Sequence, residues 1–308
     1  MHRPVISVGN ISMGGRGKTP VAGLIARMLV EAGERPAILS RGYKRRRPED
    51  GVVIVSDGQH VLADVDRAGD EPLMLARDTP GAMVLVCEMR AIAGALAERA
   101  LGATVHVLDD GFQHRAVARD IDLVVIRTAD LNGRRMPFGR LRESPSALSR
   151  ADGLIIESEE SKEFEESEKS WRAEQAVFRL HRSLGSLVAL EAGDRAARLD
   201  KAQKIVAVCG IAEPDRFTRA LPADGWTVAE TLPFPDHHAF SARDLQDIAA
   251  AVKRHGAAGV LTTAKDAMRL LPLRPLPVPI AFVPLHVAVE PAALFRDWLL
   301  SRLAEARA

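Results

Sequence analysis

The sequence predicts an α/β protein of two three-layer α/β/α domains, each with a mostly parallel sheet. Three observations support this fold class. Short β-branched runs alternate with helix-compatible stretches in both halves of the chain, an order that favours parallel strands with helices on the sheet faces. The first of these runs passes through closely spaced glycines into a helix. The length of 308 residues suits about two domains, which we expect at 1-174 and 201-308, with two hinge strands within 175-200.

Composition and charge narrow the class of protein. Hydrophobic residues make up 47% and charged residues 27% of the chain, which is typical of a globular protein. The formal net charge of +1 gives no reason to expect a nucleic acid partner. Cys87 and Cys209 stand in separate apolar runs, so we expect reduced thiols and a cytoplasmic location. We also expect no membrane span and no signal peptide, because the apolar runs are short and a strand begins almost at once.

The first strand, expected at 5–8, leads into a glycine-rich loop and a helix over 21–31. The loop sequence is Ser12-Met13-Gly14-Gly15-Arg16-Gly17-Lys18-Thr19-Pro20. Glycines let backbone N–H groups surround a phosphate, Lys18 adds a positive charge, and the Thr19 hydroxyl suits Mg²⁺. Ser12 stands where the phosphate-loop pattern has its first glycine. The alternative is a glycine-rich turn without a ligand, but the flanking strand and helix favour nucleotide binding.

The second strand, 36–40, ends in a basic segment at 41–47 that also contains Tyr43. This segment is either a solvated loop or a surface for an anionic substrate or an anionic membrane. A hairpin is expected next, formed by 52–55 and 61–63.

Two acidic residues, Asp70 and Glu71, then precede a helix over 73–77. Carboxylates at a helix start are commonly caps or partners of the helix dipole. Near a phosphate loop they equally suit a general base and a metal or donor contact. We keep both interpretations open on the pattern alone.

A later strand, 103–108, ends in Asp109 and Asp110. Ligands gather at the carboxyl edge of a parallel sheet, and a carboxylate there can anchor the Mg²⁺ of a bound nucleotide. This pair is therefore a Walker B candidate, with a simple Asp-Gly turn as the alternative. The same block continues through Gln113 and His114. Neighbouring strands are expected at 83–87, 121–126 and 154–157, and a helix at 91–101.

Two loop regions complete the first half of the chain. The loop at 133–143 is rich in glycine and arginine, and arginines form bidentate contacts to phosphate and carboxylate groups. The segment at 157–174 is strongly acidic and polar, and we interpret it as a solvated surface segment. Strands at 176–180 and 186–191 are the expected hinge.

The second half repeats the alternation of strands and helices. The expected strands are 204–209, 227–231, 260–263 and 280–283, and the expected helices are 242–255 and 291–304. Between them stands the sequence Asp236-His237-His238. It is compatible with a transition metal, but the carboxylate favours a histidine that transfers protons.

Taken together, these motifs resemble the tetraacyldisaccharide 4'-kinase family, the ATP-dependent lipid kinases of lipid A biosynthesis. The resemblance covers nearly the whole chain in family order. It rests on Val8-Gly9-Asn10 with Gly14-Gly15-Arg16-Gly17-Lys18-Thr19-Pro20 of the phosphate loop, Ser40-Arg41-Gly42-Tyr43, Gly69-Asp70-Glu71-Pro72, Asp109-Asp110-Gly111-Phe112-Gln113-His114, Pro137 with Leu141-Arg142-Glu143, Phe234-Pro235-Asp236-His237-His238, and Thr262-Thr263-Ala264-Lys265-Asp266.

The resemblance implies roles for matching positions. It implies a P-loop NTPase-like first domain, joined by a two-stranded hinge to a smaller α/β/α domain. Lys18 and Thr19 would hold ATP and Mg²⁺, with Asp109 and Asp110 on the metal side. Asp70 would take the proton of the sugar 4'-hydroxyl, with His237 in preference to His238 as its partner. Other expected contacts are Glu71, Arg90, Gln113, His114, Arg142, Glu143 and Asp236.

Two positions depart from the family pattern. Arg16 replaces a small polar residue in the loop, and we expect its charge to take the place of a hydroxyl contact to phosphate. Only four residues precede the first strand, where relatives carry an apolar or amphipathic segment. We therefore expect peripheral contact with the anionic cytoplasmic face of the inner membrane through 41–47, and a glycolipid substrate. The alternatives are a P-loop regulatory or chaperone-like NTPase and an inactive homologue.

Overall fold

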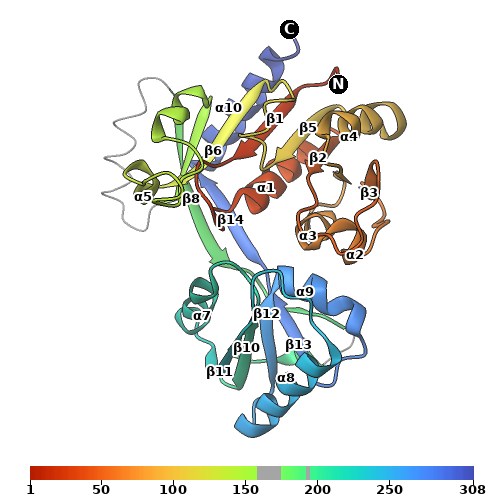
Figure 1. Cartoon of the computed structure of the whole chain (residues 1–308), viewed down its shortest axis with the longest axis vertical. Helices are drawn as coiled ribbons and strands as arrows, with labels where there is room; N and C mark the ends of the chain where they lie inside the picture. Colours follow the sequence, from red (N-terminus) through yellow and green to blue (C-terminus); the bar gives the residue numbers. More distant parts are fainter. Residues whose placement is uncertain (158–174, 192–194) are drawn as a thin grey trace. The chain divides into compact units, whose positions relative to one another are not determined.

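A computed structural model describes residues 1–157, 175–191 and 195–308. The acidic segment expected at 157–174 therefore lies, apart from Glu157, outside the described residues. The chain forms two compact units, Met1–Arg182 with Val287–Ala308, and Ser183–His286. Both chain ends belong to the first unit (Figure 1).

The first unit is built on a nine-stranded sheet in the order β14-β8-β7-β6-β1-β5-β2-β4-β3. Its strands are β1 (Val5–Gly9), β2 (Pro36–Ser40), β3 (Val53–Asp57), β4 (Met83–Val86), β5 (Val105–Asp109), β6 (Ile121–Arg127), β7 (Gly153–Glu157), β8 (Ala176–Leu184) and β14 (Leu285–Glu290). From β8 to β4 neighbouring strands are parallel, and β3 pairs antiparallel with β4 at the edge. The carboxyl ends of the central strands therefore meet at one edge of the sheet.

Helices connect these strands. They are α1 (Lys18–Glu31), α2 (Val65–Ala68), α3 (Asp70–Asp78), α4 (Arg90–Leu96), α5 (Thr128–Leu131) and α10 (Ala292–Glu305), with a π-helical turn at Ala97–Leu101 and a 3₁₀ turn at Pro145–Arg150. All five residues of β1 are buried, as the continuous apolar run of a central parallel strand predicts. Figure 1 shows α2, α3 and β3 grouped at one edge of this unit.

The second unit contains a five-stranded sheet in the order β11-β10-β12-β13-β9. Its strands are β9 (Val188–Ala189), β10 (Lys204–Cys209), β11 (Thr227–Pro233), β12 (Gly259–Thr263) and β13 (Ile280–Val283), and its helices are α7 (Pro214–Ala223), α8 (Ala242–His255) and α9 (Ala264–Leu270), with short 3₁₀ turns at Arg195–Arg198 and Leu271–Leu273. All pairs are parallel except β13 with β9. The predicted alternation of strands and helices in both halves is confirmed.

Two local predictions were wrong. The strand expected last, 280–283, is β13 and lies in the smaller unit as predicted, but the C-terminal helix α10 and the unpredicted strand β14 belong to the first unit. There β14 neighbours β8, and α10 packs Phe295 on Phe178 with 4.9 Å between the ring centroids. The sheet consequently continues beyond β7 to β8 and β14. The expected second hinge strand is instead the short β9, which pairs with β13 in the smaller sheet.

The hairpin expected at 52–55 and 61–63 is formed in part. Its arms meet antiparallel through a bridge between Ser56 and Val61 and a bond from Leu62 N to Val55 O at 2.8 Å, but the second arm forms no strand, and β3 pairs with β4 on its other edge. Pairing with the larger sheet buries Val53 and Val55, which an isolated two-stranded hairpin could not do. Among the residues that the structure describes, no helix combines the length and apolarity needed to cross a bilayer.

Candidate active site

The phosphate loop joins β1 to α1 at the carboxyl edge of the large sheet. Gly17 precedes the helix with φ 84° and ψ 16°, a left-handed conformation that glycine adopts without strain. A Cβ at this position would also lie 2.8 Å from the Arg182 guanidinium. The N-terminus of α1, with its unpaired N–H groups, therefore opens toward the loop, as anion binding requires.

Arg16 does not occupy the place that we expected from the sequence. Its guanidinium Nη2 lies 2.7 Å from Asp130 Oδ1 in a buried ion pair, and its Nε donates to Ser12 Oγ at 2.8 Å. Ser12 in turn donates to Asp130 Oδ2 at 3.2 Å. The expectation that the Arg16 charge replaces a phosphate contact is thus corrected, because Asp130 neutralises the guanidinium inside the protein. The Ser12 hydroxyl therefore has a structural role.

The two aspartates after β5 face the start of α1. Thr19 Oγ1 lies 3.1 and 3.2 Å from the two carboxylate oxygens of Asp109. Burial, together with the negative charges of Glu71 and Asp110, raises the pKa of Asp109 to about 7. Thr19 and Asp109, which were both expected on the metal side, are thus adjacent, in an environment that favours a bound cation.

The pKa of Asp110 shifts in the opposite direction. Burial acts to raise its pKa, but the Lys18 and Arg142 charges outweigh burial and lower the pKa. Lys18 Nζ lies 3.4 Å from Oδ1, and Arg142 Nη1 lies 3.2 Å from Oδ2. Asp110 has φ 58°, an uncommon conformation for a residue other than glycine. The pKa values of the two adjacent carboxyl groups are thus shifted in opposite directions, which is common in functional sites.

Asp70 and Glu71 form the first turn of α3. Gly69, with φ 87°, precedes them, and Asp70 is only 4% exposed. One Asp70 oxygen accepts the backbone N–H of Glu71 at 2.9 Å. Glu71 raises the pKa of Asp109 by its charge, so Glu71 lies within electrostatic reach of Asp109. Glu71 is therefore part of one polar cluster with Asp109 and Asp110, and Asp70 precedes it in the same helical turn.

Arg90 and His114 lie beside this cluster. Arg90 Nη1 is 3.3 Å from His114 Nδ1. Burial lowers the pKa of the Arg90 guanidinium, an effect that Asp110 opposes. Burial, followed by the charge of Arg90, lowers the pKa of His114. Arg90 Nε is a buried donor without a hydrogen-bond partner among the described residues. Such a group is costly unless a ligand or water pairs with it.

The expected residues Gln113, Arg142 and Glu143 contact one another beside the phosphate loop. Gln113 Nε2 donates to Asn10 O at 2.7 Å and to Glu143 Oε1 at 3.1 Å. Arg142 Nη1 approaches Gln113 Oε1 at 3.5 Å. Backbone bonds from 142 and 143 to Ile11 O fix these side chains to the loop. The family block at 141–143 thus supports the phosphate loop directly.

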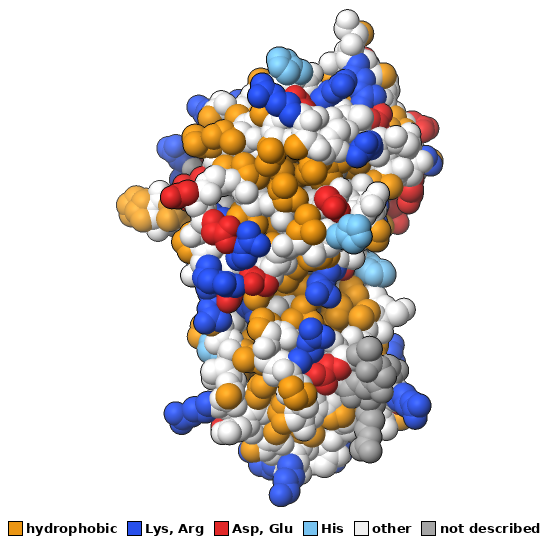
Figure 2. Space-filling model, turned by 90° about the vertical axis from the view of Figure 1, so that its right-hand side faces the viewer, with side chains coloured by type: hydrophobic (Ala, Val, Ile, Leu, Met, Phe, Trp, Pro, Cys, Tyr) orange, Lys and Arg blue, Asp and Glu red, His pale blue; other side chains and the backbone are white. Residues whose placement is uncertain are grey.

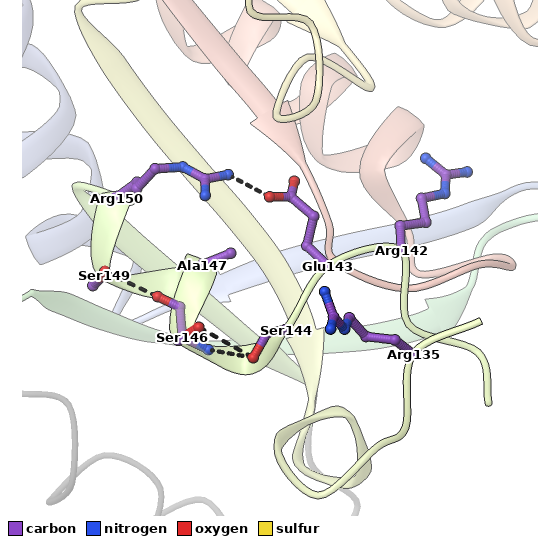
Figure 3. Close-up of a pocket in the computed structure, with 8 residues that line it drawn as sticks. All are labelled: Arg135, Arg142, Glu143, Ser144, Ser146, Ala147, Ser149 and Arg150. Carbon is purple, nitrogen blue, oxygen red and sulfur yellow. Dashed lines mark hydrogen bonds and ion pairs between the residues drawn. The ribbon is translucent and has the colours of Figure 1, made fainter. Parts of the chain in front are cut away.

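A pocket of about 420 Å³ adjoins Arg142 and Glu143 (Figure 3). Figure 3 shows the Arg150 guanidinium directed at the Glu143 carboxylate, 2.8 Å away. The lining residues are Arg135, Arg142, Glu143, Ser144, Ser146, Ala147, Ser149 and Arg150. Three arginines against one carboxylate give this pocket an excess of positive charge.

In the second unit, the His238 side chain is held in place by its neighbours. Its Nε2 lies 3.1 Å from Asp244 Oδ2, and its ring stacks on Phe234 with 4.8 Å between centroids. His237 adopts φ 63°, and its Nε2 lies 3.7 Å from Asp236 Oδ2. No group of three or more His, Cys, Asp or Glu side chains that suits a metal ion occurs in the described part of the chain.

The block at 262–266 supports this histidine turn. Thr263 caps α9 by accepting the N–H of Asp266, and Asp266 accepts the Gly210 N–H at 3.0 Å. Arg269 donates to Gly210 O and His238 O at 3.0 and 3.2 Å. Because Gly210 O also accepts the His237 N–H, the block holds the backbone that presents His237.

Comparison with known proteins identifies the family. The family model for tetraacyldisaccharide-1-P 4'-kinase matches residues 1–304. The chain belongs to this family. A tetraacyldisaccharide 4'-kinase of Desulfotalea psychrophila is 39% identical over 275 residues, covering 87% of this chain and 78% of that protein. The enzyme of the same name from Nitrobacter hamburgensis is 40% identical over 314 residues, covering 99% and 87%.

A solved structure agrees with this assignment. The "apo" form of LpxK from Aquifex aeolicus in complex with ATP matches with a TM-score of 0.79 and 30% identity, over 98% of this chain and 89% of that one. This family member is therefore a P-loop kinase, an ATP-binding transferase of lipid A biosynthesis. The predicted family, fold and enzyme class are confirmed.

Sequence reasoning missed Asp130 and gave no role to Asn10. Asn10 donates from Nδ2 to Ser12 O at 2.7 Å and so shapes the first arm of the phosphate loop. Asp130 lies three residues beyond β6, at the same sheet edge as Asp109. A carboxylate shortly after a buried central strand was a usable signal, since ligand-site residues collect at that edge.

The basic segment at 41–47 is partly neutralised in the structure. Arg47 lies 2.5 Å from Asp64, and Arg46 lies 3.6 Å from Asp66. Tyr43 is 62% exposed, with Lys44 Nζ 5.4 Å from its ring centroid. Figure 2 likewise shows acidic and basic side chains intermingled on one face of the molecule. The segment offers less net charge to a membrane than its sequence suggests.

Proposed function

We propose that this kinase transfers the γ-phosphoryl group of ATP to the 4'-hydroxyl of tetraacyldisaccharide 1-phosphate. The observation that carries the proposal is the cluster that joins the phosphate loop to Asp109, Asp110 and the Asp70-Glu71 turn. In the reaction the 4'-oxygen forms a bond to the γ-phosphorus, and the bond from that phosphorus to the β,γ-bridging oxygen breaks. The hydroxyl proton passes to Asp70, and ADP leaves.

Lys18 and the loop amides hold the phosphates of ATP in this proposal. Phosphoryl transfer requires mainly positioning and stabilisation of charge on the phosphoryl oxygens. Lys18 lies 3.4 Å from Asp110, which keeps its ammonium group at the loop. Arg142 contacts the same carboxylate, and Arg90 has a buried Nε donor available to an anion. These cations suit the charge that develops during transfer.

The donor set fits Mg²⁺. Thr19 and Asp109 bring a hydroxyl and a carboxylate within 3.2 Å of each other, and Mg²⁺ prefers oxygen ligands together with substrate phosphates. When bound, Mg²⁺ would neutralise part of the phosphate charge. Asp109, whose ionised form is costly without a cation, would be its main protein ligand, with Asp110 beside it.

Asp70 is the proposed general base. His237 is the residue that the second unit is proposed to contribute to the reaction, as the partner of Asp70. Asp70 is buried and fixed by the first turn of α3, so its carboxylate is well oriented. His237 is preferred to His238 because the latter ring is held by Asp244 and Phe234. Replacement of His238 should lower stability, whereas replacement of His237 should lower turnover with little loss of stability.

The test is ATP turnover with and without the glycolipid acceptor. Phosphorylation that depends strictly on the acceptor supports the proposal, as does its loss in Asp70→Asn with ATP binding retained. Equal hydrolysis with and without acceptor would contradict the proposal and favour a regulatory or chaperone-like NTPase. A chain that binds ATP but turns over neither substrate would be an inactive homologue.

We also propose peripheral contact with an anionic membrane surface at the cytoplasmic face of the inner membrane, because the proposed acceptor is a lipid. The segment at 41–47 is the surface expected from the sequence. Its ion pairs with Asp64 and Asp66 reduce the charge available there. Charge reversal of Lys44 and Arg45 should weaken vesicle binding if this segment contributes.

A further inference from the structure

A short basic loop, residues 134–141, extends from the first unit beside the phosphate loop; it folds back on itself through a parallel bridge between Arg135 and Leu141, and we call it the hairpin below for its shape. Its base is closed by backbone bonds from Leu141 N to Arg134 O at 3.0 Å and from Met136 N to Leu141 O at 2.9 Å. Leu141 is only 1% exposed and forms a bridge with Ser12. Met13 N donates to Arg140 O at 2.8 Å. The hairpin is therefore anchored in the core and tied to the loop that binds phosphate.

The tip of this hairpin is apolar and exposed. Phe138 is 84% exposed, the highest value among the large hydrophobic side chains of the described residues, and Met136 is 55% exposed. An aromatic side chain in water forgoes the free energy of burial. An anchored hairpin that presents two such side chains at its tip is typical of a surface that meets an apolar partner.

The flanks of the tip are basic. Arg134, Arg135 and Arg140 are all exposed, and no acidic residue occurs in the sequence between Asp130 and Glu143. Apolar side chains at the tip with cations around them match the interface of an anionic bilayer, which has acyl chains below negative headgroups.

We propose that the hairpin inserts Phe138 and Met136 into the interface of an anionic phospholipid membrane while its arginines contact the headgroups. This inference rests on the proposed function, in which the acceptor is a membrane lipid. The hairpin continues directly into Arg142, which contacts Asp110. Insertion would therefore bring the bilayer surface close to the catalytic edge, where a lipid acceptor must arrive.

A fluorescent label at the tip tests the insertion. Both native cysteines, Cys87 and Cys209, are buried, so a thiol-reactive environment-sensitive dye should react selectively with Phe138→Cys. We expect a blue shift with phosphatidylcholine vesicles that contain phosphatidylglycerol, and quenching by brominated acyl chains. The matched control is Leu294→Cys on α10, 55% exposed, which should show neither change. A tip label that stays in a polar environment, or is already blue-shifted without lipid, would overturn the proposal.

Vesicle sedimentation tests the arginines. Each charge near an anionic surface is worth about fivefold in affinity, so Arg134→Gln with Arg135→Gln should weaken binding roughly twenty-five-fold at low salt. The loss should shrink as salt rises. Equal binding of this variant and the parent chain to anionic vesicles would refute the charge contribution.

Kinase assays in detergent micelles separate this inference from the proposed function. Phe138→Ser should keep its turnover with acceptor dissolved in micelles and lose it selectively on vesicles. Vesicle insertion without any acceptor phosphorylation would refute the proposed function alone. Acceptor phosphorylation without insertion would refute the hairpin proposal alone. Thermal unfolding of each variant checks that the fold is retained.

Discussion

The buried ion pair between Arg16 and Asp130 should control both the stability of the first unit and the shape of the phosphate loop. The side chains are 6% and 4% exposed, and Asp130 Oδ2 also accepts the Ser12 hydroxyl and the Arg127 N–H at 3.2 and 3.0 Å. Asp130→Asn keeps the shape of the side chain but leaves the guanidinium buried without a counter-charge. Such a change costs about 3 kcal/mol.

This free energy predicts a measurable shift. For a unit of this size, 1 kcal/mol corresponds to roughly 2–4 °C, so the unfolding transition of the first unit should fall by about 6–12 °C. The KM for ATP should rise roughly tenfold or more, because small displacements of positioning groups are costly in rate and binding. Thermal unfolding and steady-state kinetics with varied ATP provide the two measurements.

The matched control is Glu98→Gln. Glu98 forms a buried pair with His106, 2.9 Å apart, and has hydrogen bonds to the backbone of His2 and Arg3. It should lower stability without changing the KM for ATP. If Asp130→Asn behaves in the same way, or if the double variant Arg16→Ala with Asp130→Ala restores ATP binding, the positioning role is refuted.

Three further predictions concern the catalytic edge. Asp70→Asn should lower kcat by about 10²–10⁴-fold with little change in the KM for ATP, as expected for loss of a general base; unchanged kcat in acceptor-saturated assays would exclude this role. The raised pKa of Asp109, about 7, means that the carboxyl is protonated below that pH and must ionise to bind Mg²⁺. Without metal, the contribution of Asp109 to stability is therefore greatest at acidic pH and is lost as pH rises toward 7. Stabilisation by Mg²⁺ should increase over the same interval and be absent in Asp109→Asn. Calorimetry at several pH values can check both trends. Gly17→Ala should weaken ATP binding, because alanine is strained at a φ of +84° and the loop must shift to relieve that strain; retention of parent ATP affinity in a titration would contradict this account.

Local patterns were sufficient to predict most of the secondary structure around the proposed catalytic edge. The phosphate loop, the Asp109-Asp110 pair and the start of α3 each depend on residues adjacent in sequence, whose spacing sets their geometry. Sequence also placed the central strands, because strands buried on both faces are continuous apolar runs. These parts required no knowledge of distant contacts.

Interactions between distant residues could not be predicted in this way. Arg16 pairs with Asp130, 114 residues away, and nothing near Arg16 indicates that partner. Likewise, the return of β14 to β8 depends on packing between Phe178 and Phe295, which local propensity does not encode. The hairpin tip was noted only as an arginine-rich loop, since the exposure of Phe138 depends on how the chain turns around it.

The position of β14 and α10 in the first unit has a consequence for synthesis of the protein. Residues 183–286 form a contiguous unit inserted between β8 and β14, which lie side by side in the sheet (Figure 1). On the ribosome, β8 therefore emerges roughly a hundred residues before the strand that covers its edge, a delay of about 5–20 s at typical rates of translation. During that interval the uncovered β8 is a site for wrong pairing or chaperone binding, so nascent-chain stability should increase sharply only when α10 leaves the exit tunnel.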